Sequence, residues 1–433
     1  MNAIARYFGI DGTHTTIKRE VLAGVTTFLT MAYIIFVNPD LLGKAGMDKG
    51  SVFVATCLAS AFGCIMMGVL ARLPVALAPG MGLNAFFTFT VVLGMGKSWE
   101  VALGAVFVSG VIFVLISLFK VREWIINAIP YTLKQGIVAG IGAFLAFIAL
   151  KSAGIIVAHP ATFVTLGDLT KFEPAMAILG FFLIVVFVQR KVPAAVMLAI
   201  LIVTVISLIA GHTQYAGLVS MPPSIAPTLL KLDIAGALDV SMVSVVFAFL
   251  FVVLFDTSGT LIGVTKKAGL MKTDGEIPNL GKALLADSSA AVVGSLLGTS
   301  SVTSFVESTA GVAAGGRTGL MAVVVGLLFL LALFFAPLAG MIPAYATAGA
   351  IFYVSVLMLF TLRDIDWEDL TEAAPVAVVL LLTPLTFSIA DGIALGFITY
   401  TVAKLVSGRH KEISLAVWIL TLILLAKLVF LHG

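Results

Sequence analysis

Apolar segments long enough to cross a membrane fill most of this chain of 433 residues. A helix that spans the hydrocarbon core of a bilayer needs about 20 mainly apolar residues. Fifteen candidate segments occur, at 21–37, 52–71, 82–95, 100–119, 132–151, 174–189, 192–211, 241–258, 282–298, 306–318, 319–340, 344–361, 374–389, 391–407 and 413–431. Segments 82–95, 306–318 and 374–389 are too short to cross as plain helices. The pattern predicts an all-α polytopic membrane protein.

Composition excludes the other broad classes. Hydrophobic residues make up 61% of the chain and charged residues only 11%, whereas soluble domains carry roughly 25% charged residues. The basic residues lie between apolar runs, so we expect no nucleic-acid partner. Cys57 and Cys64 lie about 10 Å apart along one predicted helix, too far for a disulfide. The scattered histidines have no metal-ligand spacing, so we expect neither a metal nor a cofactor.

Basic residues also indicate the orientation of the chain. Arg6, Lys18 and Arg19 precede the first segment, and such residues concentrate in cytoplasmic loops. If the spans alternate, the same side holds Lys120, Arg122, Arg190, Lys191, Lys266, Lys267, Lys272 and Arg317, and the other side holds Lys44, Lys49, Lys97, Lys171 and Lys231. We therefore expect a multi-pass protein of a bacterial-type inner (plasma) membrane, surrounded by lipid, with a cytoplasmic N-terminus and no removable signal peptide.

Internal repetition divides the chain into two halves. Ile129-Pro130 and Ile342-Pro343 each open an apolar segment, with a glycine seven residues after the isoleucine. Earlier in each half, a helix ends near glycines and restarts as a short helix, in GVLARLPVALAPGMGLNAFF (68–87) and GSLLGTSSVTSFVESTAGVA (294–313). The middles of these two stretches favour extended backbone over helix.

Extended backbone inside a bilayer is tolerated only where protein buries it or where it lines a cavity. Two such breaks at matching places predict inverted repeats, with residues 1–211 as the first and residues 241–407 as the second. The breaks would meet near the membrane midplane and frame a binding site. The alternative is that Pro74, Pro79 and the glycines merely kink two helices.

Two acids lie inside apolar segments, where a charge costs about 2.5–3.5 kcal/mol on insertion scales. Asp256 ends the run VVFAFLFVVLFD, about ten residues and roughly 15 Å before Lys266-Lys267, which places it near mid-depth. Glu307 begins the short helix of the second break, and Asn84 has a comparable place in the first. Helix capping or a turn role is the alternative for each of the three.

Carboxylates, an amide and a hydroxyl such as that of Thr260 suit a neutral planar heterocycle with several N–H donors. No lysine or arginine lies in the predicted site, so an anionic substrate is not expected. Phe86, Phe87 or Phe305 could cover the ring face. Burial disfavours the charged form of a carboxylate, so acids at a site that opens to either side in turn suffice for proton-coupled uptake.

Four stretches resemble a known family: GVTTFLTMAYIIFVNP (24–39), LPVALAPGMGLNAFF (73–87), FDTSGTLIGVTKKAGL (255–270) and GTSSVTSFVESTAGVAAGGRTGL (298–320). They are similar to signatures of azaguanine-type purine permeases, a branch of the nucleobase–cation symporter-2 (nucleobase–ascorbate transporter) family. The resemblance covers essentially the whole chain.

The resemblance implies fourteen core helices in two inverted sets of seven, with a short extended segment before broken helices 3 and 10. It implies a core domain of residues 20–119 plus 241–340 and a gate domain of residues 129–211 plus 342–407. Segment 413–431 would be an additional helix that crosses the membrane or lies in its interface.

The resemblance also implies proton-coupled import of adenine, guanine or hypoxanthine by alternating access. Asp256 and Glu307 correspond to substrate and proton-coupling positions and Asn84 to a substrate position, and the motif details favour adenine slightly. An anion carrier for sulfate or bicarbonate-like ions on the same architecture is the main alternative, and Glu307 argues against it. An intramembrane enzyme would need a nucleophile–base pair or metal ligands that the segments lack, and a channel fits the paired breaks less well. A homodimer is compatible with the sequence.

Overall fold

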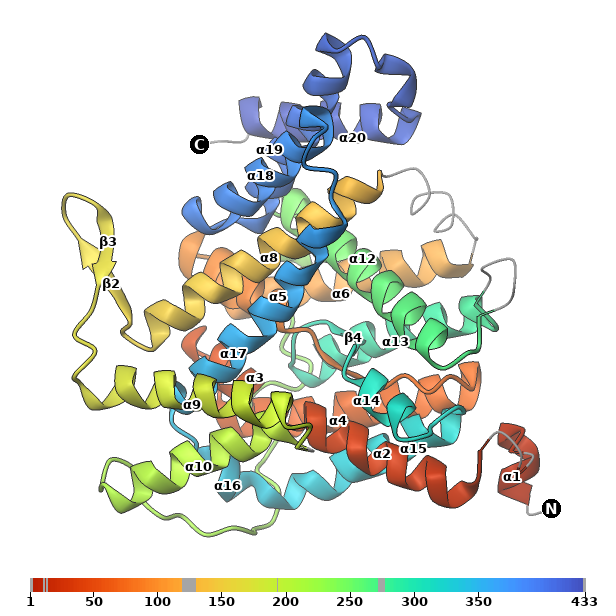
Figure 1. The fold of residues 1–433 in the computed structure, drawn as a ribbon, viewed down its shortest axis with the longest axis vertical. Coiled ribbons are helices and arrows are strands. Elements are labelled where there is room, and N and C mark those ends of the chain that lie inside the picture. The colour runs from red at the N-terminus through yellow and green to blue at the C-terminus, as the bar shows by residue number, and fades with distance from the viewer. Residues whose placement is uncertain are drawn as a thin grey trace.

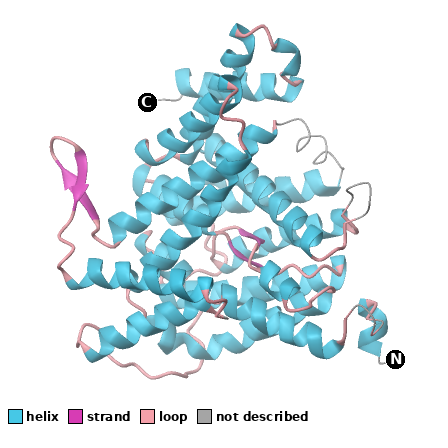
Figure 2. Ribbon diagram, in the orientation of Figure 1, coloured by secondary structure: helices cyan, strands magenta, loops and turns pink. Residues whose placement is uncertain are grey.

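The computed structural model describes residues 3–10, 12, 15–118, 130–192, 194–271 and 277–430. Helices form almost all of this part of the chain (Figures 1 and 2). Its α-helices are α1 (Ala3–Phe8), α2 (Ile17–Met31), α3 (Ile34–Lys44), α4 (Lys49–Met66), α5 (Met81–Ala85), α6 (Trp99–Leu118), α8 (Tyr131–Ser152), α9 (Phe172–Gln189), α10 (Ala195–Ile209), α11 (Ile234–Ala237), α12 (Val243–Lys267), α13 (Leu280–Leu297), α14 (Ser308–Ala313), α15 (Gly319–Ala332), α16 (Ala336–Met341), α17 (Ala344–Leu359), α18 (Leu370–Leu385), α19 (Ile389–Val406) and α20 (Leu415–Phe430). The expected basic residues Lys120, Arg122 and Lys272, and Ile129 of the repeat, lie outside the described residues.

Ten helical stretches in the described part are long and apolar enough to cross a membrane. Four shorter apolar helices accompany them: Met81–Gly94, Ala195–Ile209, Leu370–Leu385 and Leu415–Ala426. This confirms the predicted class, an all-α polytopic membrane protein.

The first predicted span, 21–37, is wrong in its bounds. The apolar stretch runs over Ile17–Lys44 and consists of α2 and α3, separated at Ala32 and Tyr33. Pro39 lies inside α3, where its missing N–H and its ring disturb the helix one turn earlier. The interruption matters because Tyr33 lies at it.

Both extended segments exist, and they pair with each other. Strand β1 (Leu77–Pro79) runs antiparallel to β4 (Val302–Ser304), with Ala78 opposite Thr303. The two short strands lie at the centre of the helical bundle (Figure 2). Strand pairing satisfies the backbone groups that a broken helix leaves open, which is why extended chain is tolerated at this depth. The interpretation of these segments as mere kinks is therefore wrong.

A second pair of strands, the hairpin of β2 (Ile156–His159) and β3 (Phe163–Leu166), projects from the side of the bundle (Figure 1). The helices themselves pack as two groups. Helices α2, α3, α4, α6, α13 and α15 contact one another extensively, as do α8, α9, α10, α17, α18 and α19, while contacts between the groups are few.

A charged cluster ties α18, α19 and the turn after α19 together. The ammonium of Lys404 is fully buried and contacts Glu372 at 2.6 Å and Glu412 at 2.8 Å. Arg409 contacts Glu412 at 2.7 Å and also bonds to Asp369. Hydrogen bonds from Arg409 hold the pKa of Asp369 well below its ordinary value. Bonds from Arg409 and then Lys404 lower the pKa of Glu412 to about 2.

We expect Arg409→Gln to lower the apparent melting temperature of the purified protein at pH 7. Because both carboxyl pKa values are depressed in the folded state, their stabilisation is present at neutral pH and is lost as the pH falls through the folded pKa values. The difference from wild type should therefore shrink between pH 4.5, the ordinary glutamate value, and about pH 2. Melting curves at pH 7 and pH 3 measure this, and an equal difference at both would contradict it.

Candidate functional site

The crossing of the two broken helices holds the candidate site. Hydrogen bonds extend the strand pairing at both ends, from Gly80 N–H to the Ser301 carbonyl at 3.0 Å and from Phe305 N–H to the Ala76 carbonyl at 2.9 Å. Helices α5 and α14 begin almost directly after the strands. The residues around both strands are thus held rigidly in the protein interior.

Asp256 lies in the middle of α12 beside this crossing. The hydroxyl of Thr303, the central residue of β4, donates to Asp256 Oδ2 at 3.0 Å. Thr303 is fully buried, whereas Asp256 is partly exposed. One carboxylate oxygen of Asp256 is therefore held by the strand, while the residue remains partly exposed.

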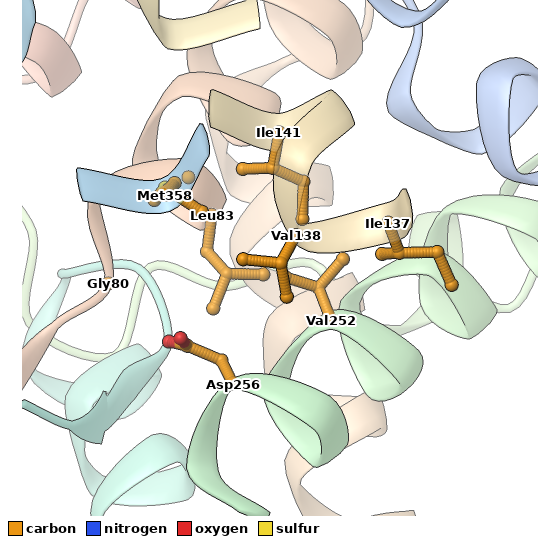
Figure 3. A pocket seen from close by; sticks show the side chains of 9 residues that line it. Gly80, Leu83, Ile137, Val138, Ile141, Val252, Asp256 and Met358 are labelled. Atoms are coloured by element: carbon orange, nitrogen blue, oxygen red, sulfur yellow. The ribbon is translucent and has the colours of Figure 1, made fainter. Parts of the chain in front are cut away.

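A cavity lies in front of the Asp256 carboxylate (Figure 3). Its lining consists of Gly80, Gly82, Leu83, Ile137, Val138, Ile141, Val252, Asp256 and Met358. Asp256 is the one charged residue in this set. Figure 3 shows the rest of the lining as apolar: Ile137, Val138 and Ile141 of α8, Leu83 of α5, Val252 of α12 and the thioether Met358 of α17. The arrangement suits a ligand with one polar edge and apolar faces.

Glu307 begins α14, as the sequence predicts. Its Oε1 accepts a hydrogen bond of 2.7 Å from the hydroxyl of Tyr33, a residue only 1% exposed. Asp256 lies within electrostatic range of Asp287 and Glu307. Tyr353 of α17 also lies within electrostatic range of Glu307. Each of the two acids is held by a hydroxyl donor, Asp256 by Thr303 and Glu307 by Tyr33.

Asn84 in α5 is fully buried. Its amide oxygen accepts a hydrogen bond from the Ser300 hydroxyl, while its amide nitrogen has no hydrogen-bond partner within the described residues. An unpaired buried polar group costs about 1–3 kcal/mol. Asn84 therefore retains an unused donor next to the strand crossing.

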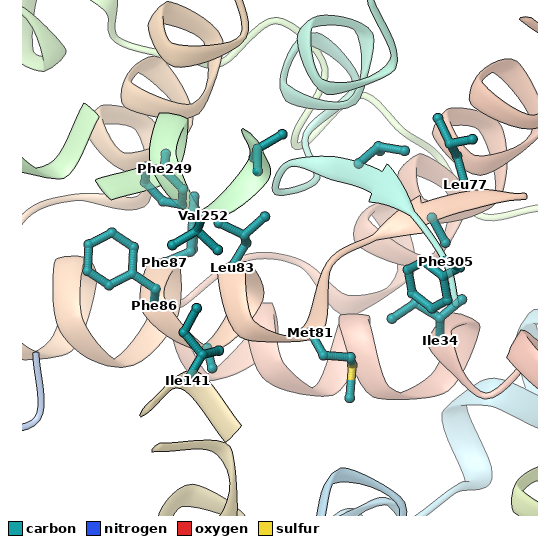
Figure 4. Packing of buried hydrophobic residues seen from close by; sticks show 14 of the residues in the cluster. Ile34, Leu77, Met81, Leu83, Phe86, Phe87, Ile141, Phe249, Val252 and Phe305 are labelled. Atoms are coloured by element: carbon teal, nitrogen blue, oxygen red, sulfur yellow. The ribbon is translucent and has the colours of Figure 1, made fainter. Parts of the chain in front are cut away.

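Asp256 alone of the predicted site residues lines this cavity, and Glu307 and Asn84 are not among its lining residues. The remaining predicted residues lie elsewhere. Thr260 is nearly buried, one turn along α12 from Asp256. Phe86 and Phe87 are fully buried (Figure 4), and the Phe86 ring packs edge-on against Phe249 at 5.0 Å. Phe305 lies near Ile34, away from Phe86 (Figure 4). In this structure the cavity wall is aliphatic rather than aromatic.

Sequence reasoning missed several residues of this region. Tyr33 and Thr303 are polar residues inside two of the stretches that resemble the family, but the sequence alone does not assign either residue a role. Asp287 is fully buried and accepts hydrogen bonds from Thr257 at 2.7 Å and Ser304 at 2.8 Å. Asp287 thereby connects α12 to β4 directly beside Asp256. No pattern in the sequence identified the aliphatic residues that line the cavity.

Comparisons with known proteins show the family of the chain. The Permease family model (Xan_ur_permease) matches residues 18–395. Adenine permease AdeP of Escherichia coli strain K12 is 50% identical over 430 residues, covering 99% of this chain and 97% of that protein. Guanine/hypoxanthine permease PbuG of Bacillus subtilis strain 168 is 46% identical, covering 98% of this chain and 99% of that protein.

Solved structures share the fold at low identity. The transmembrane domain of the cyanobacterial bicarbonate transporter BicA superposes with a TM-score of 0.64 at 19% identity, covering 87% of this chain and 97% of that one. SLC26A9 gives a TM-score of 0.67 at 12% identity, covering 93% of this chain and 68% of that one. The chain belongs to the Xan_ur_permease family, a family of transporters rather than enzymes, in the azaguanine-type branch with the adenine and guanine/hypoxanthine permeases.

Proposed function

We propose that this protein imports purine nucleobases, with adenine preferred over guanine and hypoxanthine, by proton-coupled alternating access. One observation carries the proposal: Asp256, bonded to Thr303 of β4, and Glu307, at the start of α14, both lie beside the crossing of the two broken helices. Relatives named adenine permease and guanine/hypoxanthine permease match along almost the whole chain.

The chemistry of the site supports a neutral heterocycle. The Thr303 hydroxyl donates to Asp256 Oδ2 and the Tyr33 hydroxyl to Glu307 Oε1. Carboxylate oxygens carry several lone pairs, so both groups can also accept N–H groups from a purine edge. The Asn84 amide nitrogen can donate to a ring nitrogen or an exocyclic oxygen. The aliphatic wall can cover the ring face.

The architecture supports alternating access. The group of helices that contains α6 and α13, against which α12 also packs, would be the core domain, and the group that contains α8 and α17 would be the gate domain. Counting α5 and α14 as helices 3 and 10 gives fourteen core helices, with α20 as an additional one. Relative movement of the two groups would expose the cavity to each side in turn, with the N-terminus in the cytoplasm.

An anion carrier is the competing function, because the solved structures of similar fold include a bicarbonate transporter and an anion transporter. A carboxylate repels an anion, and the cavity lining contains no lysine or arginine. A neutral substrate is therefore favoured.

We expect uptake of labelled adenine, in cells that lack their own purine permeases, to collapse when a protonophore is added. The proton gradient would be the driving force, so its removal leaves only equilibration. Unlabelled adenine, guanine, hypoxanthine, uracil and sulfate as competitors define the substrate. Uptake that survives the protonophore but stops without sodium would show that sodium, and not the proton, is the coupling ion. Competition by sulfate alone would favour the anion carrier.

A further inference from the structure

We propose that Gly82 and Ile141 form the contact that closes the Asp256 cavity and limits the size of the purine it admits. The proposal rests on the proposed function for the identity of the substrate. The contact itself rests on geometry alone.

Gly82 lies in α5 directly under the side chain of Ile141 from α8. A Cβ atom added at Gly82 would lie 2.4 Å from Ile141 Cγ2 and 3.9 Å from Ile141 Cβ. The first distance is far inside ordinary van der Waals contact. Gly82 is helical and has no positive φ, so backbone conformation does not require glycine there, and glycine weakens a helix. Glycine is required at position 82 because the Cγ2 methyl group of Ile141 occupies the space that a Cβ atom would need.

This contact joins the two groups of helices. Helix α5 continues directly from β1, which pairs with β4, while α8 packs mainly against α17 and α18. If the groups move relative to each other during transport, Ile141 must leave the position above Gly82 and return to it. A rigid, close-packed contact of this kind has two discrete states rather than a continuum.

The contact also bounds the cavity. Gly82 lines it together with Ile141 and Asp256, and Figure 3 shows the latter two. The lining residues from α8 and α17 are all aliphatic or thioether side chains, which touch a ligand without forming hydrogen bonds. The polar edge of a purine would therefore be held by Asp256, and the bulk at position 141 would set how large a ring substituent fits.

We expect Gly82→Ala to reduce adenine uptake about tenfold or more, because the added methyl group overpacks the closed contact. The double variant Gly82→Ala/Ile141→Ala should recover uptake to within about threefold of Ile141→Ala alone, because the two sites are directly coupled. Gly82→Ala/Val138→Ala removes bulk from the same wall without relieving the clash, so it should not recover. Full uptake by Gly82→Ala, or equal recovery with Val138→Ala, would overturn the proposal.

Ile141→Ala should also relax the size limit. Adenines with an alkyl or benzyl group on the exocyclic nitrogen should compete with labelled adenine about tenfold better in Ile141→Ala than in wild type. Unchanged competition would remove the role in size selection.

A cysteine pair tests the contact independently of substrate. The Cβ–Cβ distance of 3.9 Å suits a disulfide, so Gly82→Cys/Ile141→Cys should crosslink on mild oxidation. The natural cysteines, Cys57 and Cys64, are buried, and the two single-cysteine variants serve as controls. Peptide mass spectrometry detects the crosslink. We expect oxidation to abolish uptake, a reductant to restore it, and excess adenine to slow crosslinking.

The outcomes separate the two proposals. A wild-type protein that imports no purine would refute the proposed function, while crosslinking would still show whether the contact forms. A wild-type importer whose cysteine pair never crosslinks, or whose crosslinked form transports at the full rate, would refute the closing contact and leave the function standing.

Discussion

Asp256→Asn should reduce adenine uptake about a hundredfold or more while the protein still reaches the membrane. Asparagine keeps the size of the side chain but replaces a charged acceptor with one neutral oxygen and an N–H₂ donor. Whichever way the amide turns, Thr303 or the substrate then meets a donor instead of an acceptor. Initial uptake rates, normalised to the amount of protein in the membrane, measure the loss.

The matched control makes the same chemical change outside the cavity. Asp168 accepts from Thr170 in an exposed turn, so Asp168→Asn should leave uptake within about twofold of wild type. Thr303→Val keeps the carboxylate but removes its donor, so it should raise KM more than it lowers the maximal rate. Wild-type uptake by Asp256→Asn would exclude Asp256 from the site.

The sequence predicted where extended segments interrupt the helices better than it predicted which face of each helix lines the cavity. The glycines, prolines and small polar residues around 77–79 and 302–304 cannot form a good helix, so their extended backbone was foreseeable. Asp256 and Glu307 were also foreseeable, because a carboxylate within an apolar segment needs a specific reason to be there. Both expectations depend on residue type and position along the chain alone.

The lining of the cavity was not foreseeable for a physical reason. A spanning helix is hydrophobic all round, since it meets lipid on one face and protein on the other. The hydrophobic periodicity of the sequence therefore does not reveal which face of a helix lines the cavity. It gives no sign that Ile141 lines the cavity while Phe86 packs against Phe249. The rotation of each helix follows from packing, and aromatic character alone selected side chains that do not line this cavity.

Tyr33 illustrates a second limit. It reaches Glu307 across 274 residues of sequence, and it does so from the interruption between α2 and α3. A single continuous helix over 21–37, as predicted, would have given no reason to assign this tyrosine a role. Contacts between distant segments depend on such irregularities, which a hydrophobicity pattern does not resolve.

Glu307→Gln should separate substrate recognition from coupling to protons. Glutamine preserves the shape of the side chain and one acceptor oxygen, but it has no group that titrates. We expect accumulation of adenine against its gradient to be lost, while exchange of labelled for unlabelled adenine persists at a reduced rate. Uptake by the variant should also be independent of pH between about pH 5 and 8, because the proton-binding group of the transport cycle is gone.

Tyr33→Phe supplies the matched control, since it removes the hydroxyl that donates to Glu307 at 2.7 Å and keeps the carboxylate itself. Without its donor the carboxylate is held less firmly, so KM should rise about tenfold, the equivalent of one lost hydrogen bond to a charged group. The pH dependence and the response to a protonophore should remain. If Glu307→Gln instead kept the wild-type pH response and accumulated adenine, another group would carry the proton, and Asp256, which the same assays can test as Asp256→Asn, would be the next residue to examine.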